Sequence, residues 1–156
     1  MQHVRMTETN LMRDVGSRSV ASARRMAVHQ IFAPFPVAYF TAALATDLRY
    51  WQTAEVMWEN FSMWLITVGL IMSAVTVFAG VIDLASGRHK PAWLRAAGYA
   101  LAVLLSLINV FIHSRDAYTA VVPTGLTLSV FVVVILLAMA PAGWALTSPR
   151  RVGANT

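Results

Sequence analysis

The sequence predicts an all-α integral membrane protein, an up-and-down four-helix bundle with both termini in the cytoplasm. The first observation is that four long uncharged stretches divide the chain, each close to the ~20 residues needed to cross ~30 Å of hydrocarbon. The second is that Lys and Arg alternate between the gaps: five precede the first stretch, three separate the second from the third, two follow the fourth, and each other gap holds one. Short basic loops are retained in the cytoplasm, so this alternation predicts four spans and their orientation.

The composition supports a surface covered by lipid. The chain is 58% hydrophobic and 12% charged, against roughly 25% charged residues in soluble domains. The net charge of +5 comes without the stacking aromatics or recognition helix of a nucleic-acid-binding protein, so no nucleic-acid partner is expected. Attraction to anionic lipid explains the basic residues better. The absence of cysteine excludes disulfides, thiolate metal sites and iron–sulfur clusters.

The first span is predicted over about 31–48. Pro34 and Pro36 lie near its start, where helix N–H groups lack partners in any case, so the regular helix is expected to begin after Phe35. The following segment, 49–60, is rich in Trp and Tyr. It is interpreted as a separate interfacial turn of helix at the outer surface.

The other three spans are predicted over about 61–84, 91–113 and 121–146. The second is uncharged until Asp83, and Gly87 then offers a C-terminal cap. Pro91 suits the first turn of the next helix, which predicts a tight inner hairpin. Connections this short place consecutive helices side by side and antiparallel.

Three regions follow from these spans. Residues 1–28 are expected to form a basic cytoplasmic tail, 29–147 the four-helix transmembrane domain, and 148–156 a second cytoplasmic tail. The first 25 residues carry five Arg and two acidic residues without an apolar core, a pattern that does not fit a secretory signal peptide.

Ionisable groups near a span are candidate sites by default. His29, Asp83 and His89 should gather at the cytoplasmic boundary, because the first helix begins there, the second ends there and the inner hairpin follows. A carboxylate facing an imidazole can hold a proton, orient a metal ligand or bind a headgroup. The preferred interpretation is structural: Asp83 pairs with Arg88 or His29 to satisfy a helix end.

A second polar cluster is predicted at the outer boundary, formed by Asp47, Arg49, Glu55, Glu59, His113, Arg115 and Asp116. Most of these groups are expected to be solvated loop charges, whose exposed pairs contribute about 0–1 kcal/mol. Asn109 lies within the third span, where hydrogen bonding between helices is its expected role.

Haem needs a direct test, because four-helix membrane bundles often hold it between facing histidines. His29 is predicted at the inner end and His113 at the outer end, about 30 Å apart, so one iron cannot join them. Haem b or a quinone bound through His29 alone stays an alternative to having no cofactor. Hydrolase, zinc-protease and phosphate-loop motifs are absent from the sequence, so catalytic residues, a metal site and enzyme activity are not expected.

The segment His29-Gln-Ile-Phe-Ala-Pro-Phe-Pro resembles the start of the first helix in a bacterial membrane protein family catalogued as domain of unknown function 2231. Asp47, Gly80-Val-Ile-Asp83 and Gly143-Trp144 are similar to later features of that family, and the resemblance covers about 27–147. Met26 stands where the family's first histidine would be, Gly98 or Tyr99 falls where a third-helix histidine is frequent, and Gln30 stands where proline is. The resemblance therefore implies a four-span membrane protein, sometimes linked with respiratory or periplasmic dehydrogenase systems, and argues against an independent cofactor site.

The leading hypothesis is a non-catalytic small integral membrane subunit of a bacterial inner-membrane complex, with respiratory, electron-transferring complexes as candidate hosts. Its partners would be the lipid bilayer and other membrane subunits or further copies of itself. One alternative is a haem- or quinone-binding electron-transfer protein that uses His29. A further alternative is a small transporter or proton-path component centred on His29 and Asp83.

Overall fold

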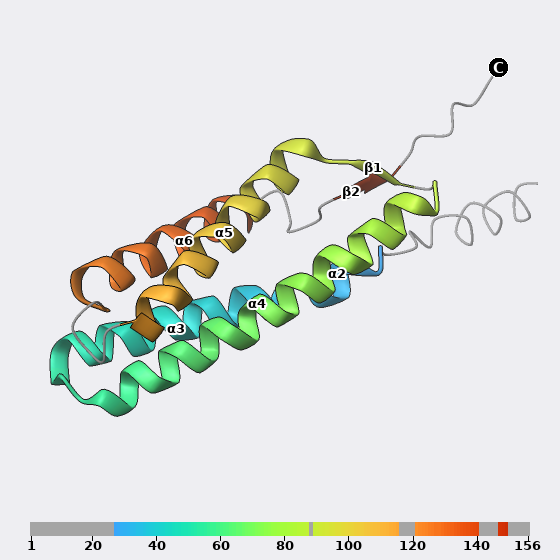
Figure 1. Cartoon of the computed structure of the whole chain (residues 1–156). Coiled ribbons are helices and arrows are strands. Elements are labelled where there is room, and N and C mark those ends of the chain that lie inside the picture. The colour runs from blue at the N-terminus through green and yellow to red at the C-terminus, as the bar shows by residue number, and fades with distance from the viewer. Residues whose placement is uncertain (1–26, 88, 116–120, 141–146, 150–156) are drawn as a thin grey trace, which may run out of the picture.

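Four long helices build the molecule (Figure 1). The computed structural model describes residues 27–87, 89–115, 121–140 and 147–149. The long helices are α3 (Pro34–Thr53), α4 (Val56–Ala85), α5 (Trp93–Arg115) and α6 (Leu126–Met139). The short elements are α2 (His29–Phe32), β1 (His89–Pro91), η1 (Val121–Gly125) and β2 (Thr147–Pro149). Together with α2 and η1, the four helices provide four segments long and apolar enough to cross a membrane, as the predicted fold class requires.

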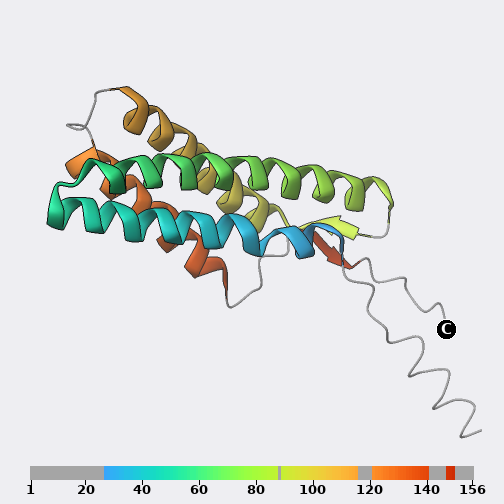
Figure 2. The same cartoon turned by 90° about the horizontal axis from the view of Figure 1, so that it is seen from below.

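The helices form a ring in which each one packs against its neighbours in the chain. The α3–α4 contact is the most extensive, α5 packs against α6, and the α3–α6 contact joins the two pairs. The α4–α5 contact is the least extensive of the four. Figure 2 shows α3 and α4 side by side along the molecule. We call the end where α3 joins α4 the turn end, and the end that carries β1 and β2 the strand end.

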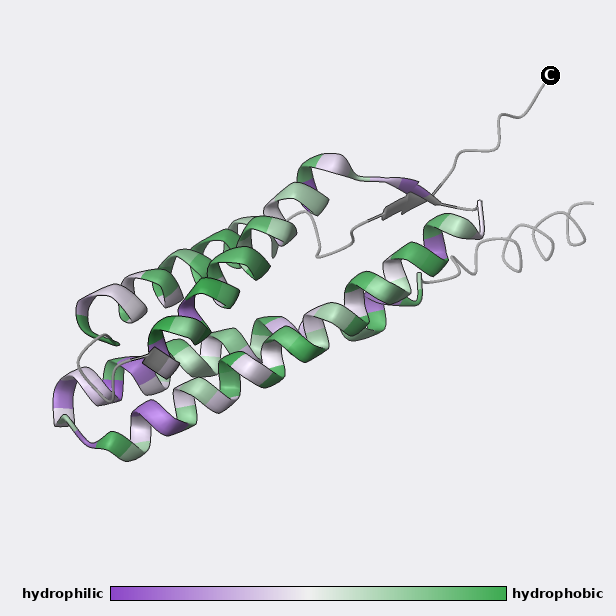
Figure 3. Ribbon diagram, in the orientation of Figure 1, coloured by the Kyte–Doolittle hydropathy of each residue, from purple (hydrophilic) through white to green (hydrophobic). Residues whose placement is uncertain are grey.

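Large apolar side chains cover the outside of the bundle, and many of the residues buried within it are small or polar. Figure 3 shows hydrophobic residues along all four helices. Phe78, Phe111 and Leu137 are each more than half exposed. Ser73 and Thr76, by contrast, are buried, and their hydroxyls donate to carbonyls of their own helix at 2.8 Å. This distribution suits a protein whose outer surface is solvated by lipid.

The first helix differs from its prediction at both ends. Regular α3 begins at Pro34, before Phe35. Proline is tolerated there because it lacks only an N–H group, and the N–H groups of the first turn have no helical acceptor in any case. The segment 49–60 is not a separate interfacial helix. Instead α3 continues to Thr53, Ala54 reverses the chain with a left-handed φ of 55°, and α4 follows.

The strand end contains a two-stranded ribbon that the sequence did not predict. β1 pairs antiparallel with β2, so that Lys90 faces Ser148 and Pro91 faces Thr147. The third helix consequently begins at Trp93 and not at Pro91, and residues 148–149 belong to a strand. Strands of three residues show no periodic pattern that could reveal them. Helix α6 ends at Met139, and residues 141–146 of the predicted fourth span lie outside the described part.

Gly69 allows α3 and α4 to approach closely. A Cβ atom at this position would lie 2.7 Å from Cε1 of Phe40, whose ring is buried in the core with Val37, Ile66 and Leu136. The ring cannot move away without disturbing that packing, so a side chain at Gly69 has no space.

We predict that Gly69→Ala lowers the free energy of unfolding by about 1–3 kcal/mol, the usual cost of overpacking. Unfolding by sodium dodecyl sulfate in mixed micelles measures it. Gly98→Ala is the control, because its Cβ would meet only the flexible end of Met139 at 3.2 Å. Combining Gly69→Ala with Phe40→Leu should cost less than the two single changes added together. Equal stabilities of Gly69→Ala and Gly98→Ala would contradict the close α3–α4 approach.

Candidate functional site

The carboxylate of Asp47 joins all four spanning helices. Asp47 lies on α3 with no exposed surface. It accepts a short hydrogen bond from Ser62 of α4 and one of 2.5 Å from the Ser129 hydroxyl of α6. Nε2 of His113, on α5, lies 3.0 Å from Asp47 Oδ1. One side chain from each of the other three long helices therefore meets this carboxylate.

Asn109 and the α5 backbone extend these contacts. The amide nitrogen of Asn109 donates to the Ser129 hydroxyl at 2.8 Å, and Nδ1 of His113 donates to the Asn109 carbonyl at 2.9 Å. The hydrogen bond from Asn109 to Ser129 joins α5 to α6, as expected for a polar residue within a span. We call Asp47, Ser62, Asn109, His113 and Ser129 the Asp47 network.

The packing around the network keeps water away from its core side. A Cβ atom at Gly125 of η1 would lie 2.8 Å from His113 Cε1, so the backbone approaches the imidazole closely there. The gap between Phe40, Asn109 and Ser129 has no room for a water molecule. The hydrogen bonds of the network thus lie in a dry environment, where each is stronger than in water and expensive to break.

Glu59 lies beside the network without joining its hydrogen bonds. It stands in the first turn of α4, is 4% exposed, and interacts electrostatically with His113 and Asp47. Its Oε2 is buried and has no hydrogen-bond partner. The expectation of solvated loop charges is therefore wrong for Asp47, Glu59 and His113, although Arg49 and Glu55 are exposed.

The structure also brings His29 and Asp83 together, at the strand end. Nδ1 of His29 lies 2.7 Å from Asp83 Oδ2, and the backbone N–H groups of Val28 and His29 donate to the same carboxylate at 3.1 and 3.0 Å. The first N–H groups of a helix lack helical acceptors. Asp83 of α4 supplies acceptors at the start of α2, which is the structural role preferred from the sequence.

Two predicted site residues cannot be placed in these clusters. His89 lies in β1 opposite Pro149, and Arg115 ends α5, but the side chains of both lie outside the described part. The two clusters themselves are far apart. Ser62 and Asp83 both belong to α4, and their separation along the helix is about 30 Å at ~1.5 Å per residue. His29 and His113 therefore cannot share one iron.

The described ranges contain no evident metal-binding site. Within them, no three His, Asp or Glu side chains are placed so that they could hold a metal ion. What the clusters offer chemically is two buried imidazole–carboxylate pairs, one with a further carboxyl beside it. Such groups can hold and exchange protons, or join helices.

Ser62 and Ser129 were missed from the sequence, and a spacing signal could have found them. The inward positions of α5 recur every three or four residues, at Tyr99, Ala102, Ser106, Asn109 and His113. In α4 the same spacing leads from Ser62 to Asp83. Small and polar residues at this spacing mark the interior of a membrane bundle, just as apolar residues mark the interior of a soluble one.

Four apolar spans arranged around inward polar side chains define a multi-pass integral membrane protein. Comparison with known families agrees. The chain belongs to the family described as predicted membrane protein DUF2231, whose model matches residues 25–156. No curated protein and no solved structure was found to match the chain.

We predict that Ser129→Ala destabilises the bundle by about 1–3 kcal/mol, because it leaves Asp47 Oδ2 and the Asn109 amide without their partner. Ser106→Ala is the matched control. Ser106 is equally buried, but its hydroxyl donates only to the Ala102 carbonyl of its own helix, at 2.9 Å. Unfolding in mixed micelles measures both variants. If Ser106→Ala proved as damaging as Ser129→Ala, the bridge between helices would have no special role.

Proposed function

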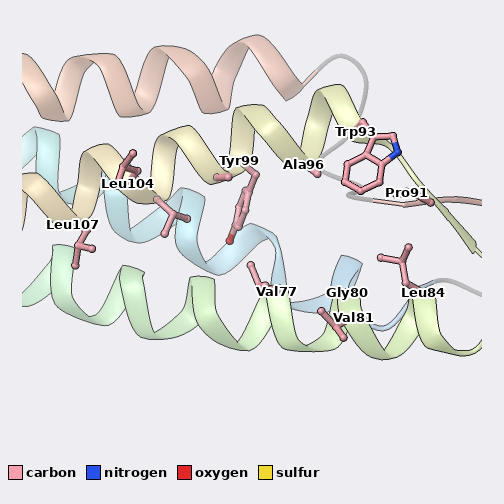
Figure 4. A pocket seen from close by; sticks show the side chains of 12 residues that line it. Val77, Gly80, Val81, Leu84, Pro91, Trp93, Ala96, Tyr99, Leu104 and Leu107 are labelled. Carbon is pink, nitrogen blue, oxygen red and sulfur yellow. The ribbon is translucent and has the colours of Figure 1, made fainter.

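We propose that the protein is a small non-catalytic subunit of a bacterial inner-membrane complex, and that a transmembrane helix of a partner subunit binds between α4 and α5. The observation that carries this proposal is an apolar groove of about 510 Å³ between these two helices (Figure 4). It coincides with the least extensive contact in the ring. The bundle is therefore least complete on this side.

The residues that line the groove suit a helix as occupant. Gly80 of α4 and Ala96 and Ala100 of α5 are among them. Ala96 and Ala100 are four residues apart and share one face of α5. Small residues at this spacing let helix backbones approach closely within membranes. A flexible lipid chain does not need small residues in order to pack, so they favour a helix as the occupant of the groove.

Apolar surface continues from the groove to the strand end. Trp93 lines the groove and is 77% exposed, and the neighbouring Leu94 is 88% exposed. Large aromatic side chains dominate the energetics of protein interfaces. This surface would extend the contact with a partner beyond the hydrocarbon.

The buried polar groups support a role without catalysis. His29 and Asp47 have no exposed surface, and the residues that bind them come from other parts of the bundle. Neither of them lines the groove. Their hydrogen bonds hold the bundle together and leave the groove as the surface for association.

Charge supports an orientation for the complex. The strand end carries Lys90 and Arg95, from the basic gap between the second and third spans. Basic loops are retained on the cytoplasmic side, so we place the strand end in the cytoplasm and the turn end outside. The family resemblance favours a respiratory or dehydrogenase complex as the host.

The two alternative functions receive less support. Haem or quinone binding through His29 would require a residue without exposed surface to open toward a ligand. A proton path between the two clusters would have to pass the buried hydrophobic cluster that contains Phe40, Ile66 and Leu136. Both alternatives therefore need a conformational change that partner binding does not.

We predict that a photo-crosslinking amino acid at position 100 captures a peptide from a transmembrane helix of a partner protein in native membranes. The same probe at position 97 is the matched control, because Ala97 is also an exposed alanine of α5 but does not line the groove. Mass spectrometry identifies the adducts. The Ala100→Trp variant, which fills the groove, should release that partner in mild detergent, whereas Ala97→Trp should retain it.

Lipid adducts alone at both positions would contradict the proposal. So would an adduct at position 100 with a second copy of this chain, since the proposal requires a different subunit.

A further inference from the structure

The carboxyl group of Glu59 is a buried polar group that neither bonds within the Asp47 network nor lines the α4–α5 groove. Only 4% of the residue is exposed. Its Oε2 is enclosed by protein and has no hydrogen-bond donor. An ionised carboxylate in such a place is strongly destabilised. A buried acid of this kind is stabilised when it takes up a proton or a counter-ion.

The charged groups around Glu59 come from two neighbouring helices. Asp47 of α3 and His113 of α5 interact with it electrostatically, whereas neither η1 nor α6 contains a titratable residue. The guanidinium of Arg49 lies over the Trp58 ring, 5.7 Å from its centroid, on the exposed side. On α4 itself Glu55 is exposed and accepts from Trp58 Nε1. At this site the described residues therefore supply one imidazole, that of His113, for the two buried carboxyl groups of Asp47 and Glu59.

Hydrogen-bond directions show how many protons the Asp47–His113 pair holds. Nδ1 of His113 must carry a proton, because its partner is the Asn109 carbonyl, which can only accept. One more proton lies between Nε2 and Asp47 Oδ1, whichever of the two atoms holds it. The pair is then neutral as a whole. An ionised Glu59 would leave the buried cluster with one net negative charge, and a single added proton would remove it.

We propose that Glu59, together with the Asp47 network, forms a binding site for one exchangeable proton. The proton resides on the Glu59 carboxyl and is exchanged with the aqueous phase at the turn end. A proton suits the site better than a metal ion, since no metal-holding group of His, Asp and Glu occurs in the described ranges. This site lies apart from the α4–α5 groove and gives the chain a ligand that the proposed function does not include.

The position of the site sets the route of exchange. Glu59 stands three residues after the start of α4 and Asp47 six residues before the end of α3, so they lie roughly 5–9 Å from the turn end at ~1.5 Å per residue. On the other side, the gap beside Asn109 and Ser129 cannot hold water. The turn end is therefore the nearer side for exchange of the proton with water.

Infrared difference spectroscopy of the full chain in lipid nanodiscs tests the proposal. We expect the wild type to show the carbonyl band of a protonated carboxylic acid that shrinks as the pH is raised. Glu59→Gln should remove it, whereas Glu55→Gln, which changes an exposed glutamate four residues away, should leave it intact. An identical pH-dependent band in wild type and Glu59→Gln would overturn the assignment.

Isotope labelling tests the same point without any substitution that could disturb folding. The chain has three glutamates, Glu8, Glu55 and Glu59. Selective ¹³C labelling of glutamate carboxyl groups in the wild type should shift the band to lower frequency, and Glu55→Gln should not diminish the shifted band. A band that does not move on glutamate labelling would assign the proton to an aspartate and overturn the proposal.

Discussion

The arrangement of this bundle depends on the carboxylate of Asp47, which has to find its hydrogen-bond donors inside the protein. Lipid offers none, so a buried acid on α3 determines which side chains of the other helices must face it. Ser62, Ser129 and His113 meet it from α4, α6 and α5. Each of these residues has a fixed position along its helix, and its side chain leaves the helix in one direction. The contacts with Asp47 therefore set the axial position and the rotation of all four helices together.

The rest of the molecule follows from the same division between lipid and interior. Helix association in a membrane relies on close packing and internal hydrogen bonds, because apolar surface gains little by leaving lipid. The close approach at Gly69 and Phe40 supplies the packing, and the Asp47 network and the His29–Asp83 pair supply hydrogen bonds near opposite ends. With its polar groups turned inward, the chain presents an apolar exterior whose least complete side is the groove between α4 and α5.

The sequence was sufficient for the number of spans, because membrane thickness sets their length and the alternation of basic loops counts them. It also placed His29 beside Asp83, since helix ends at one boundary must meet. The sequence did not predict the burial of Asp47 and Glu59, because nearness to a turn does not distinguish an exposed position from a buried one. Only their helical rotation, which the three-to-four-residue spacing of polar positions records, turns them inward. The β1–β2 ribbon joins short segments about 60 residues apart in the chain and leaves no local pattern.

The most direct test of the account is the unfolding free energy of Asp47→Ala in lipid bicelles, compared with that of Thr46→Ala. Thr46 is the neighbouring residue, and its hydroxyl donates only to carbonyls of its own helix. Removing the Asp47 carboxylate leaves donors from three other helices buried without an acceptor, so the account predicts a loss of about 3–5 kcal/mol, against about 1 kcal/mol or less for Thr46→Ala. Equal and small losses in the two variants would contradict the claim that Asp47 holds the four helices in place.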